Sequence, residues 1–463
     1  MKAVKSLPRI IQLAFMLILI LSIVACAPKQ GFVFVPDKSL SVLLEKAPAY
    51  PETSLVVFSD PHIYDTSLGT TGKAFEAYIA ADRKLVREGP EILDAAVTAI
   101  KELKADIILV PGDLSKDGEK SSHELAASYL AQLKASGKKV YVVPGNHDIK
   151  NGHSYGYVGD GMKRVPNVTA EQFTQIYADY GFKDALQHDT DSISYVAEPQ
   201  PGLWLLALDS CRWKENVEDK ETITDGKFSP QTLAWIQKML GQAANDNKAV
   251  IVMMHHGIME HYVGQEKNYG EYIVDDYEAV AKMFASYNVR MVFTGHYHAQ
   301  DITEKKYADN GKFVFDIETG SLATYPCPYR IMNITNDQQA IIKEGMVTSI
   351  KSHPTDFQQF ASQYLLSGIA GIATKTLMGY GIGQAESENI AKQIAQGFAA
   401  HYAGDEKLAP GQQPVVETGL SPLAWAVIQY RKDLIVGLWN DLEPADNNVT
   451  LNLKDGSWKA NQP

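Results

Sequence analysis

The sequence predicts an α/β protein in which two packed sheets are flanked by helices, followed by a smaller, mainly helical C-terminal domain. Three observations support this fold class. Short apolar runs typical of buried strands recur between residues 53 and 317, and helical patterns lie between them. After about residue 346, strand runs become rare and alanine, glutamine and helical spacing increase. We therefore expect an α/β domain at 52–345 and a helical domain at 346–463.

The N-terminus has the pattern of an export signal. Three basic residues precede an apolar run at 10–25, which is short for a stable membrane span. The sequence I-V-A-C, which ends at Cys26, resembles the lipobox of bacterial lipoproteins and implies lipid attachment to that cysteine. We expect a signal peptide at 1–25, a linker at 26–51 and a membrane-anchored lipoprotein outside the cytoplasm. An uncleaved signal anchor or a simple secreted protein is the alternative.

Five apolar runs are each followed by polar residues that can bind metals. The runs lie at 55–58, 107–110, 140–143, 250–253 and 291–293. In chain order, the polar residues after them are Asp60 and His62, then Asp113, then Asn146, His147 and Asp148, then His255 and His256, and finally His296 and His298. Loops converge at the carboxyl ends of strands in layered α/β proteins. These side chains are therefore expected to meet at one site.

Helices and further strands complete the first domain. Helices are expected at 89–104, at 121–135 and at 229–240, the last begun by Ser229 as N-cap and Pro230 in the first turn. Additional core strands are expected at 203–208 and 313–317, and a charged loop near the mouth of the site at 214–227.

The C-terminal domain is expected to contain helices at 355–366, 387–403 and 421–442. The glycine-punctuated apolar run at 367–383 is too interrupted for a membrane span, and we interpret it as a helix hairpin. Residues 448–453 alternate and predict a final edge strand. Two further cysteines, Cys211 and Cys327, could pair in an oxidising compartment, and the sequence leaves this open.

The residue types at the expected site favour a pair of divalent ions. Asp, Asn and His without thiolate suit Mn, Fe, Co or Zn, and none of the three cysteines lies in these segments. Seven candidate ligands are too many for one tetrahedral ion and suit two ions that share a carboxylate. Two ions roughly 3.5–4 Å apart can hold both the attacking and the leaving oxygen at phosphorus. This chemistry indicates hydrolysis of phosphate esters.

The ordered set D-x-H, G-D, G-N-H-D, H and G-H-x-H resembles the calcineurin-like metallophosphoesterase family over about residues 53–325. The resemblance implies the two-sheet metallophosphoesterase sandwich and a bridging hydroxide as nucleophile. It implies that Asp60, His62 and His298 hold one metal, that Asn146, His255 and His296 hold the other, and that Asp113 bridges them. It also places His147 beside the leaving group, with Asp148 fixing its tautomer and orientation.

Several residues near the ligand segments could also contact metal or substrate. Either His255 or His256 could be the ligand, and we favour His255. Asp65 and His261 lie close to ligand segments, and we interpret both as solvated loop residues. Five histidines without a motif are expected to be structural or surface residues: His123, His153, His188, His353 and His401.

Charge and location restrict the substrate. The chain carries 43 Lys and Arg against 55 Asp and Glu, a net charge of −12, which does not favour binding to a nucleic-acid polymer. A small phosphoester is expected, a diester or nucleotide more than a monoester. The alternatives are a phosphomonoesterase and a catalytically silent, surface-anchored binding protein. Candidates for substrate contact include Tyr64, Tyr262, Tyr325 and Arg330. The helical C-terminus resembles, diffusely, that of some bacterial calcineurin-like enzymes placed among cyclic nucleotide phosphodiesterases.

Overall fold

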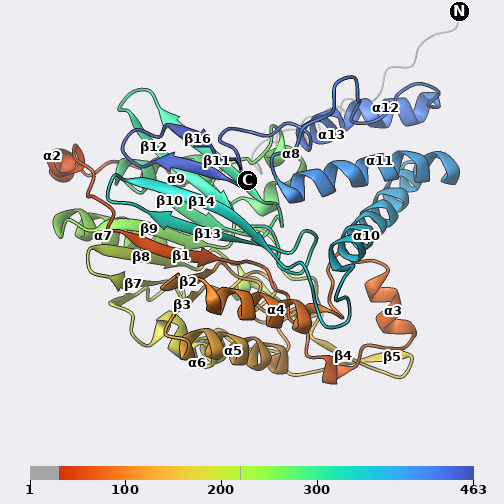
Figure 1. The fold of residues 1–463 in the computed structure, drawn as a ribbon, viewed down its shortest axis with the longest axis horizontal. Helices are drawn as coiled ribbons and strands as arrows, with labels where there is room; N and C mark the ends of the chain where they lie inside the picture. Colours follow the sequence, from red (N-terminus) through yellow and green to blue (C-terminus); the bar gives the residue numbers. More distant parts are fainter. Residues whose placement is uncertain (1–30, 219, 463) are drawn as a thin grey trace, which may run out of the picture. The chain divides into compact units, whose positions relative to one another are not determined.

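The computed structural model describes residues 31–218 and 220–462. From Val35 onward, two seven-stranded sheets share one hydrophobic core (Figure 1). The first sheet has the strand order β16-β15-β14-β13-β1-β2-β3. Its strands are β1 (Thr53–Val57), β2 (Ile107–Val110), β3 (Lys139–Val142), β13 (Pro328–Ile334), β14 (Gln339–Met346), β15 (Val449–Asn452) and β16 (Trp458–Ala460).

The second sheet has the order β11-β12-β10-β9-β8-β7-β6. Its strands are β6 (Gln187–His188), β7 (Tyr195–Gln200), β8 (Leu203–Leu208), β9 (Ala249–Met254), β10 (Met291–Thr294), β11 (Asp301–Tyr307) and β12 (Lys312–Glu318). A separate hairpin pairs β4 (Tyr155–Val158) with β5 (Gly161–Arg164). The predicted fold class, two mixed sheets with flanking helices and a helical C-terminal region, is confirmed.

Parallel pairing in both sheets brings the motif-bearing loops to one edge. In the first sheet β1, β2 and β3 run parallel, and in the second β8, β9, β10 and β12 run parallel. These strands are almost wholly buried, which explains why the sequence shows continuous apolar runs rather than alternation. The loops that leave their carboxyl ends therefore converge.

Helices flank the two sheets, and the three predicted at 89–104, 121–135 and 229–240 are among them. They are α2 (Ser41–Leu44), α3 (Lys73–Ile79), α4 (Gly89–Glu102), α5 (Lys120–Ala135), α6 (Ala170–Ile176), α7 (Pro230–Asn245), α8 (Gln265–Tyr269) and α9 (Tyr277–Ser286). The expected start of α7 is confirmed, because Ser229 accepts a hydrogen bond from the Thr232 backbone N–H and Pro230 follows it.

The C-terminal helices differ from the expected ones at two places. They are α10 (Phe357–Gly379), α11 (Gln384–Ala403), α12 (Pro422–Tyr430) and α13 (Lys432–Gly437). The helix expected to end at 366 continues to Gly379, so 367–383 is not a hairpin of its own. Gly368 lets this helix approach the chain at Asp82, since a Cβ there would lie 2.8 Å from the Asp82 carbonyl oxygen. The single helix expected at 421–442 is broken at Arg431.

Within the part of the chain from Val35 onward, segments near both ends pack on the first domain. β15 pairs with β14, and β16 pairs with β15, so the predicted last strand lies one place inside the sheet edge. At the other end, α2 contacts α7 and the buried Tyr50 donates a hydrogen bond to the Val250 carbonyl, so part of the expected linker packs on the domain. The expected signal peptide and Cys26 lie outside the described residues. In the described part, no helix is long and apolar enough to cross a membrane.

Candidate metal centre

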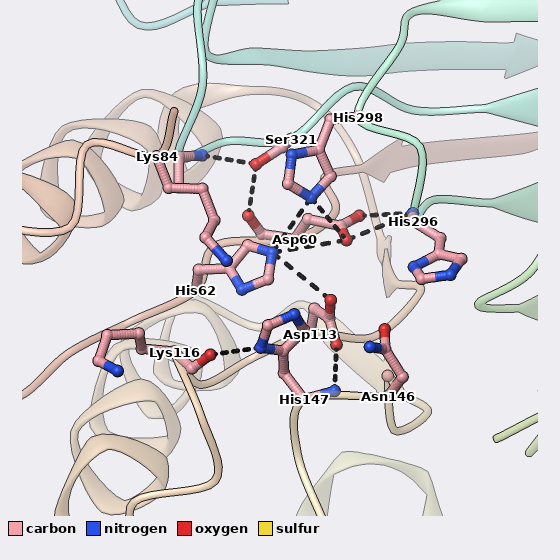
Figure 2. Close-up of polar contacts among 12 residues, drawn as sticks. Asp60, His62, Lys84, Asp113, Lys116, Asn146, His147, His296, His298 and Ser321 are labelled. Atoms are coloured by element: carbon pink, nitrogen blue, oxygen red, sulfur yellow. Dashed lines mark hydrogen bonds and ion pairs between the residues drawn. The ribbon is translucent and has the colours of Figure 1, made fainter. Parts of the chain in front are cut away.

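Seven of the predicted site residues converge where the strands end, and Figure 2 labels all of them except His255. Four of them, Asp60, His62, Asp113 and His298, form one group whose possible ligand atoms lie within 4.8 Å of one another. The His62 Nε2 atom lies 3.1 Å from His298 Nε2 and 3.5 Å from Asp113 Oδ2, and His298 Nε2 lies 3.6 Å from Asp60 Oδ1. All four side chains are buried. This is the geometry of a cation site with two nitrogen and two carboxylate ligands.

A second group shares Asp113 with the first. Asp113, His255 and His296 also place possible ligand atoms within 4.8 Å of one another. The His255 Nε2 atom lies 3.5 Å from Asp113 Oδ2 and 3.1 Å from Asn146 Oδ1. The buried Nε2 atom of His296 has no hydrogen-bond partner among the described residues, as expected of a nitrogen that would bind a metal. Asp113 therefore lies between the two groups, and the residues fit a pair of ions with one bridging carboxylate.

Three of the four ligand histidines are held neutral, as metal binding requires. Burial lowers the pKa of His62, His296 and His298 well below the usual histidine value, so these imidazoles are neutral. Burial would lower the pKa of the fourth, His255, but Asp113 outweighs it and raises that pKa to about 9, so this histidine has to lose a proton when a metal binds.

Burial raises the pKa of Asp60 to about 7. Burial would also raise the pKa of Asp113, but the positive charges of His255 and His147 outweigh it and hold that pKa well below its usual range. The bridging position thus carries a carboxylate.

The backbone is strained at five of the candidate ligand residues. Asp60, His62, Asp113, His296 and His298 all have positive φ, between 41° and 78°.

Close approach explains the glycine of the third motif. A Cβ on Gly145 would lie 2.0 Å from Asp113 Oδ1, so glycine is required beside the shared carboxylate.

His147 lies beside the first group, but its partner is not the one expected. Its Nδ1 donates to the Lys116 carbonyl oxygen at 2.7 Å and to Asp117 Oδ1 at 2.9 Å. Asp148 instead accepts backbone N–H groups of Leu114, Ser115 and Gly145 at 2.9–3.1 Å. The prediction that Asp148 orients His147 is therefore wrong: Asp117 and a carbonyl hold the ring, and Asp148 holds the loop that carries Asp113.

Of the two adjacent histidines, His255 faces the metal centre, as we favoured, and His256 does not. His255 Nδ1 donates to the Pro111 carbonyl oxygen at 2.8 Å, which leaves Nε2 facing Asp113. His256 has both ring nitrogens occupied, by Ser210 Oγ and the Thr224 carbonyl oxygen, each at 2.8 Å. His256 therefore lies behind the ligand residues and supports them instead of binding a metal. The Thr224 contact also brings the predicted charged loop against the site.

Other candidates lie in the interior. His261 is fully buried, 2.7 Å from Asp301 Oδ1, so its interpretation as a solvated loop residue is wrong. Arg330 is also fully buried and donates to backbone carbonyls, which excludes it as a substrate contact. Tyr64 and Tyr262 are buried, Tyr325 is half-buried, and Asp65 caps a short helical turn through Ser67. Cys211 and Cys327 are both free thiols.

Sequence reasoning missed two charged residues at the site. Asp117 is one, and Lys84 is the other: its side chain is buried, extends beside His62 and lies 3.6 Å from Asp82 (Figure 2). No motif surrounds Lys84, so only the folded chain reveals it. A buried ammonium group next to the ligands is suited to an anionic ligand such as a phosphate oxygen.

The comparisons with known proteins agree with this geometry. The family described as calcineurin-like phosphoesterase matches residues 53–300, more than half of the chain. The chain belongs to the calcineurin-like phosphoesterase family. A probable cyclic nucleotide phosphodiesterase from a Synechococcus strain is 25% identical over 199 residues, which cover 43% of this chain and 60% of the relative. The match thus spans less than two thirds of that relative's length.

Among solved structures, a dimetal phosphatase from Danio rerio is similar at 16% identity with a TM-score of 0.45, over 64% of this chain and 96% of that one. A purple acid phosphatase from yellow lupin (Lupinus luteus) seeds is similar at 11% identity with a TM-score of 0.40, over 66% of this chain and 53% of that one.

Proposed function

We propose that this protein hydrolyses phosphate esters with two divalent ions, and that diesters are its preferred substrates. The observation that carries the proposal is the Asp113 carboxylate, which lies between two buried ligand groups. Asp60, His62 and His298 hold one ion, and Asn146, His255 and His296 hold the other. The pair supplies Lewis-acid stabilisation of negative charge and a water of lowered pKa.

Residues around the ions donate the proton to the leaving group and stabilise the charge of the phosphate. His147 is partly accessible, and its Nδ1 is occupied by Asp117 and the Lys116 carbonyl, so its Nε2 is free to hold a proton near the leaving oxygen. Burial works to lower the pKa of His147, but Asp113 and Asp117 outweigh it, and the pKa is raised. The protonated imidazole is therefore favoured. Lys84 contributes positive charge for the non-bridging phosphate oxygens.

An adjoining cavity supports a diester with one bulky, largely apolar group. The cavity has a volume of about 320 Å³ and is lined by α10 to α13 together with aromatic side chains next to the ligands. Among these, the Tyr272 ring lies 4.4 Å from the His296 ring, and Tyr297 lies between the two ligand histidines in sequence. Arg83, next to Lys84 in sequence, also lines it. A monoester leaves such a cavity unused, whereas the second ester group of a diester can enter it.

The test is hydrolysis by metal-depleted protein to which Mn, Fe, Co or Zn is returned. Bis-p-nitrophenyl phosphate is compared with p-nitrophenyl phosphate, and Asp113→Ala is the inactive control. We expect metal-dependent turnover with the diester preferred and no turnover by the variant. A monoester preference would make the protein a phosphomonoesterase. Binding of two metals without turnover on either ester would favour the silent binding protein.

The cellular location is also a proposal. The export signal, the lipobox-like segment and Cys26 support a lipoprotein anchored outside the cytoplasm. Labelling of the expressed protein with a radioactive fatty acid, compared with Cys26→Ser, tests it: the wild type should be labelled and the variant should not.

A further inference from the structure

The cavity beside the metal centre opens at the surface of the helical region. Ile372 in α10 and Tyr380 at its end both line the cavity, and they are 38% and 40% exposed, so the opening lies along this helix. Tyr272, whose ring lies 4.4 Å from the His296 ring, lines the same cavity. The cavity therefore joins the metal centre to the surface of the helical region.

Two more exposed apolar side chains lie beside this opening. Arg431 donates a hydrogen bond to Tyr380 Oη at 3.1 Å, and its guanidinium carbon lies 5.4 Å from the centre of the Tyr430 ring. Leu423 lies beside the end of α10, since a Cβ on Gly381 would be 3.6 Å from the Leu423 side chain. Tyr430 is 64% exposed and Leu423 is 46% exposed. We call Ile372, Tyr380, Leu423 and Tyr430 the apolar rim.

The segments that carry the apolar rim contain no acidic residue, although the whole chain has a net charge of −12. Residues 357–383 include one charged residue, Lys375, and residues 418–432 include only Arg431 and Lys432. Surface helices of globular proteins normally present charged residues on the face opposite to the core. Apolar and aromatic side chains with basic residues beside them match the surface of an anionic membrane.

The lining of the cavity favours an acyl chain over a polar group. Its polar wall residues are already paired, since Arg431 donates to Asn268 Oδ1 at 3.3 Å and Arg83 donates to Tyr402 Oη at 2.9 Å. The aliphatic wall residues come from α10, α12 and α13 and include Ile369, Leu377, Val427, Ile428 and Ile435. A polar group there would lose its hydrogen bonds with water, whereas an alkyl chain gains by leaving water.

We propose that the substrate is a phospholipid taken from a membrane on which the apolar rim lies. This inference rests on the proposed diesterase activity. One acyl chain occupies the cavity, and the phosphodiester reaches the ligand residues.

The reaction is hydrolysis of one ester bond at phosphorus. A water oxygen bonds to phosphorus, one P–O ester bond breaks, and the leaving oxygen takes the proton held by His147. One proton of the water replaces the proton on His147, and the other stays with the phosphate. The products are an alcohol and a phosphate monoester.

The test compares a lipid surface with two soluble diesters. Vesicles of phosphatidylglycerol present the phospholipid as a surface, and monomeric dihexanoyl phosphatidylglycerol presents it without one. Bis-p-nitrophenyl phosphate reports catalysis alone. Phosphorus NMR follows conversion of the phospholipid diester to a monoester, whichever ester bond breaks. Every protein is the metal-loaded full chain with the same N-terminus, so a lipid anchor is common to all of them.

The variants change exposed side chains. Leu423→Glu combined with Tyr430→Glu, the rim variant, places two negative charges on the apolar rim. In the described part of the chain, neither side chain lines the cavity. Val42→Glu combined with Leu186→Glu is the matched control, since both residues are exposed, apolar and outside the helical region.

We expect wild type and the control variant to hydrolyse all three diesters. The rim variant should be at least about tenfold slower on vesicles, because it loses apolar contact with the membrane and is repelled by the anionic lipid. It should keep the wild-type rate on both soluble diesters, which also shows that it folds. If it does not fold, wild type decides: hydrolysis of vesicular phosphatidylglycerol supports the proposal, and its absence rejects it.

Turnover of bis-p-nitrophenyl phosphate without turnover of either phospholipid would overturn this inference and leave the proposed function standing. Failure on all three diesters would reject both. Equal rates of wild type and the rim variant on vesicles would show that the apolar rim does not lie on the membrane. A wild-type dimer that the rim variant dissociates in the absence of lipid would also overturn the inference, because the rim would then be an interface between two copies of this chain.

Discussion

A single methyl group added at Gly145 should disable the metal centre without unfolding the protein. The Cβ of Gly145→Ala would lie 2.0 Å from Asp113 Oδ1 and 2.3 Å from the Asp113 backbone nitrogen, whereas ordinary contact begins at 3.4 Å. The shared carboxylate must therefore move by more than about 1 Å, and a displacement of that size at a reacting centre costs about 10²-fold in rate.

The assay pairs metal analysis with turnover. Gly145→Ala, reconstituted with the preferred metal, should hold fewer than two ions per chain and lose at least about 10²-fold in kcat/KM on the diester. Gly371→Ala is the matched control, since nothing lies within 4 Å of its added Cβ in α10. The control should retain both ions and full activity. Two ions and wild-type turnover in Gly145→Ala would refute the argument from contact at Asp113.

Three further predictions concern His147, the cavity and pH. Asp117→Asn should lower kcat by about 10–100-fold, more for an alkyl than for a p-nitrophenyl leaving group, and an equal loss on both would argue against proton donation by His147. Ala373→Trp should reduce kcat/KM on a p-nitrophenyl dodecyl phosphodiester more than on bis-p-nitrophenyl phosphate and spare p-nitrophenyl phosphate, and unchanged values on the long ester would exclude the cavity. Burial raises the pKa of Asp209 to about 6 from 3.8, so its contribution to stability is lost as pH rises through that interval. The Tm of wild type relative to Asp209→Asn should therefore fall between pH 4 and 7, and a constant difference would contradict it.

The ligand residues could be predicted because each follows a strand directly. A run such as 291–293 followed by His296 and His298 places its polar residues at the sheet edge whatever the loops do. Hydrogen-bond partners that depend on the shape of a loop could not be predicted. Asp148 is next to His147 in sequence, yet the turn after Asp113 brings Asp117 to the ring instead.

The other differences between prediction and structure arise from contacts between residues that lie far apart in the sequence. Glu260 precedes His261 in the sequence, yet the buried carboxylate partners of His261 come from β11 and β12. The length of α10 was obscured by its glycines, of which Gly368 serves contact with Asp82 rather than a turn. Composition alone does not separate these two uses of glycine.

The pairing of β14 with β15 makes the helical region an excursion between two neighbouring strands. Ile342 pairs with Val449, so the chain leaves the sheet after Met346 and returns beside the same strand about a hundred residues later. Truncation after residue 346 would strip β15 and β16 from the sheet and leave β14 as an unprotected edge. Replacing the helices with a short loop that connects β14 directly to β15 would keep all seven strands paired. Such a deletion is therefore the better way to separate the helical region from the catalytic domain.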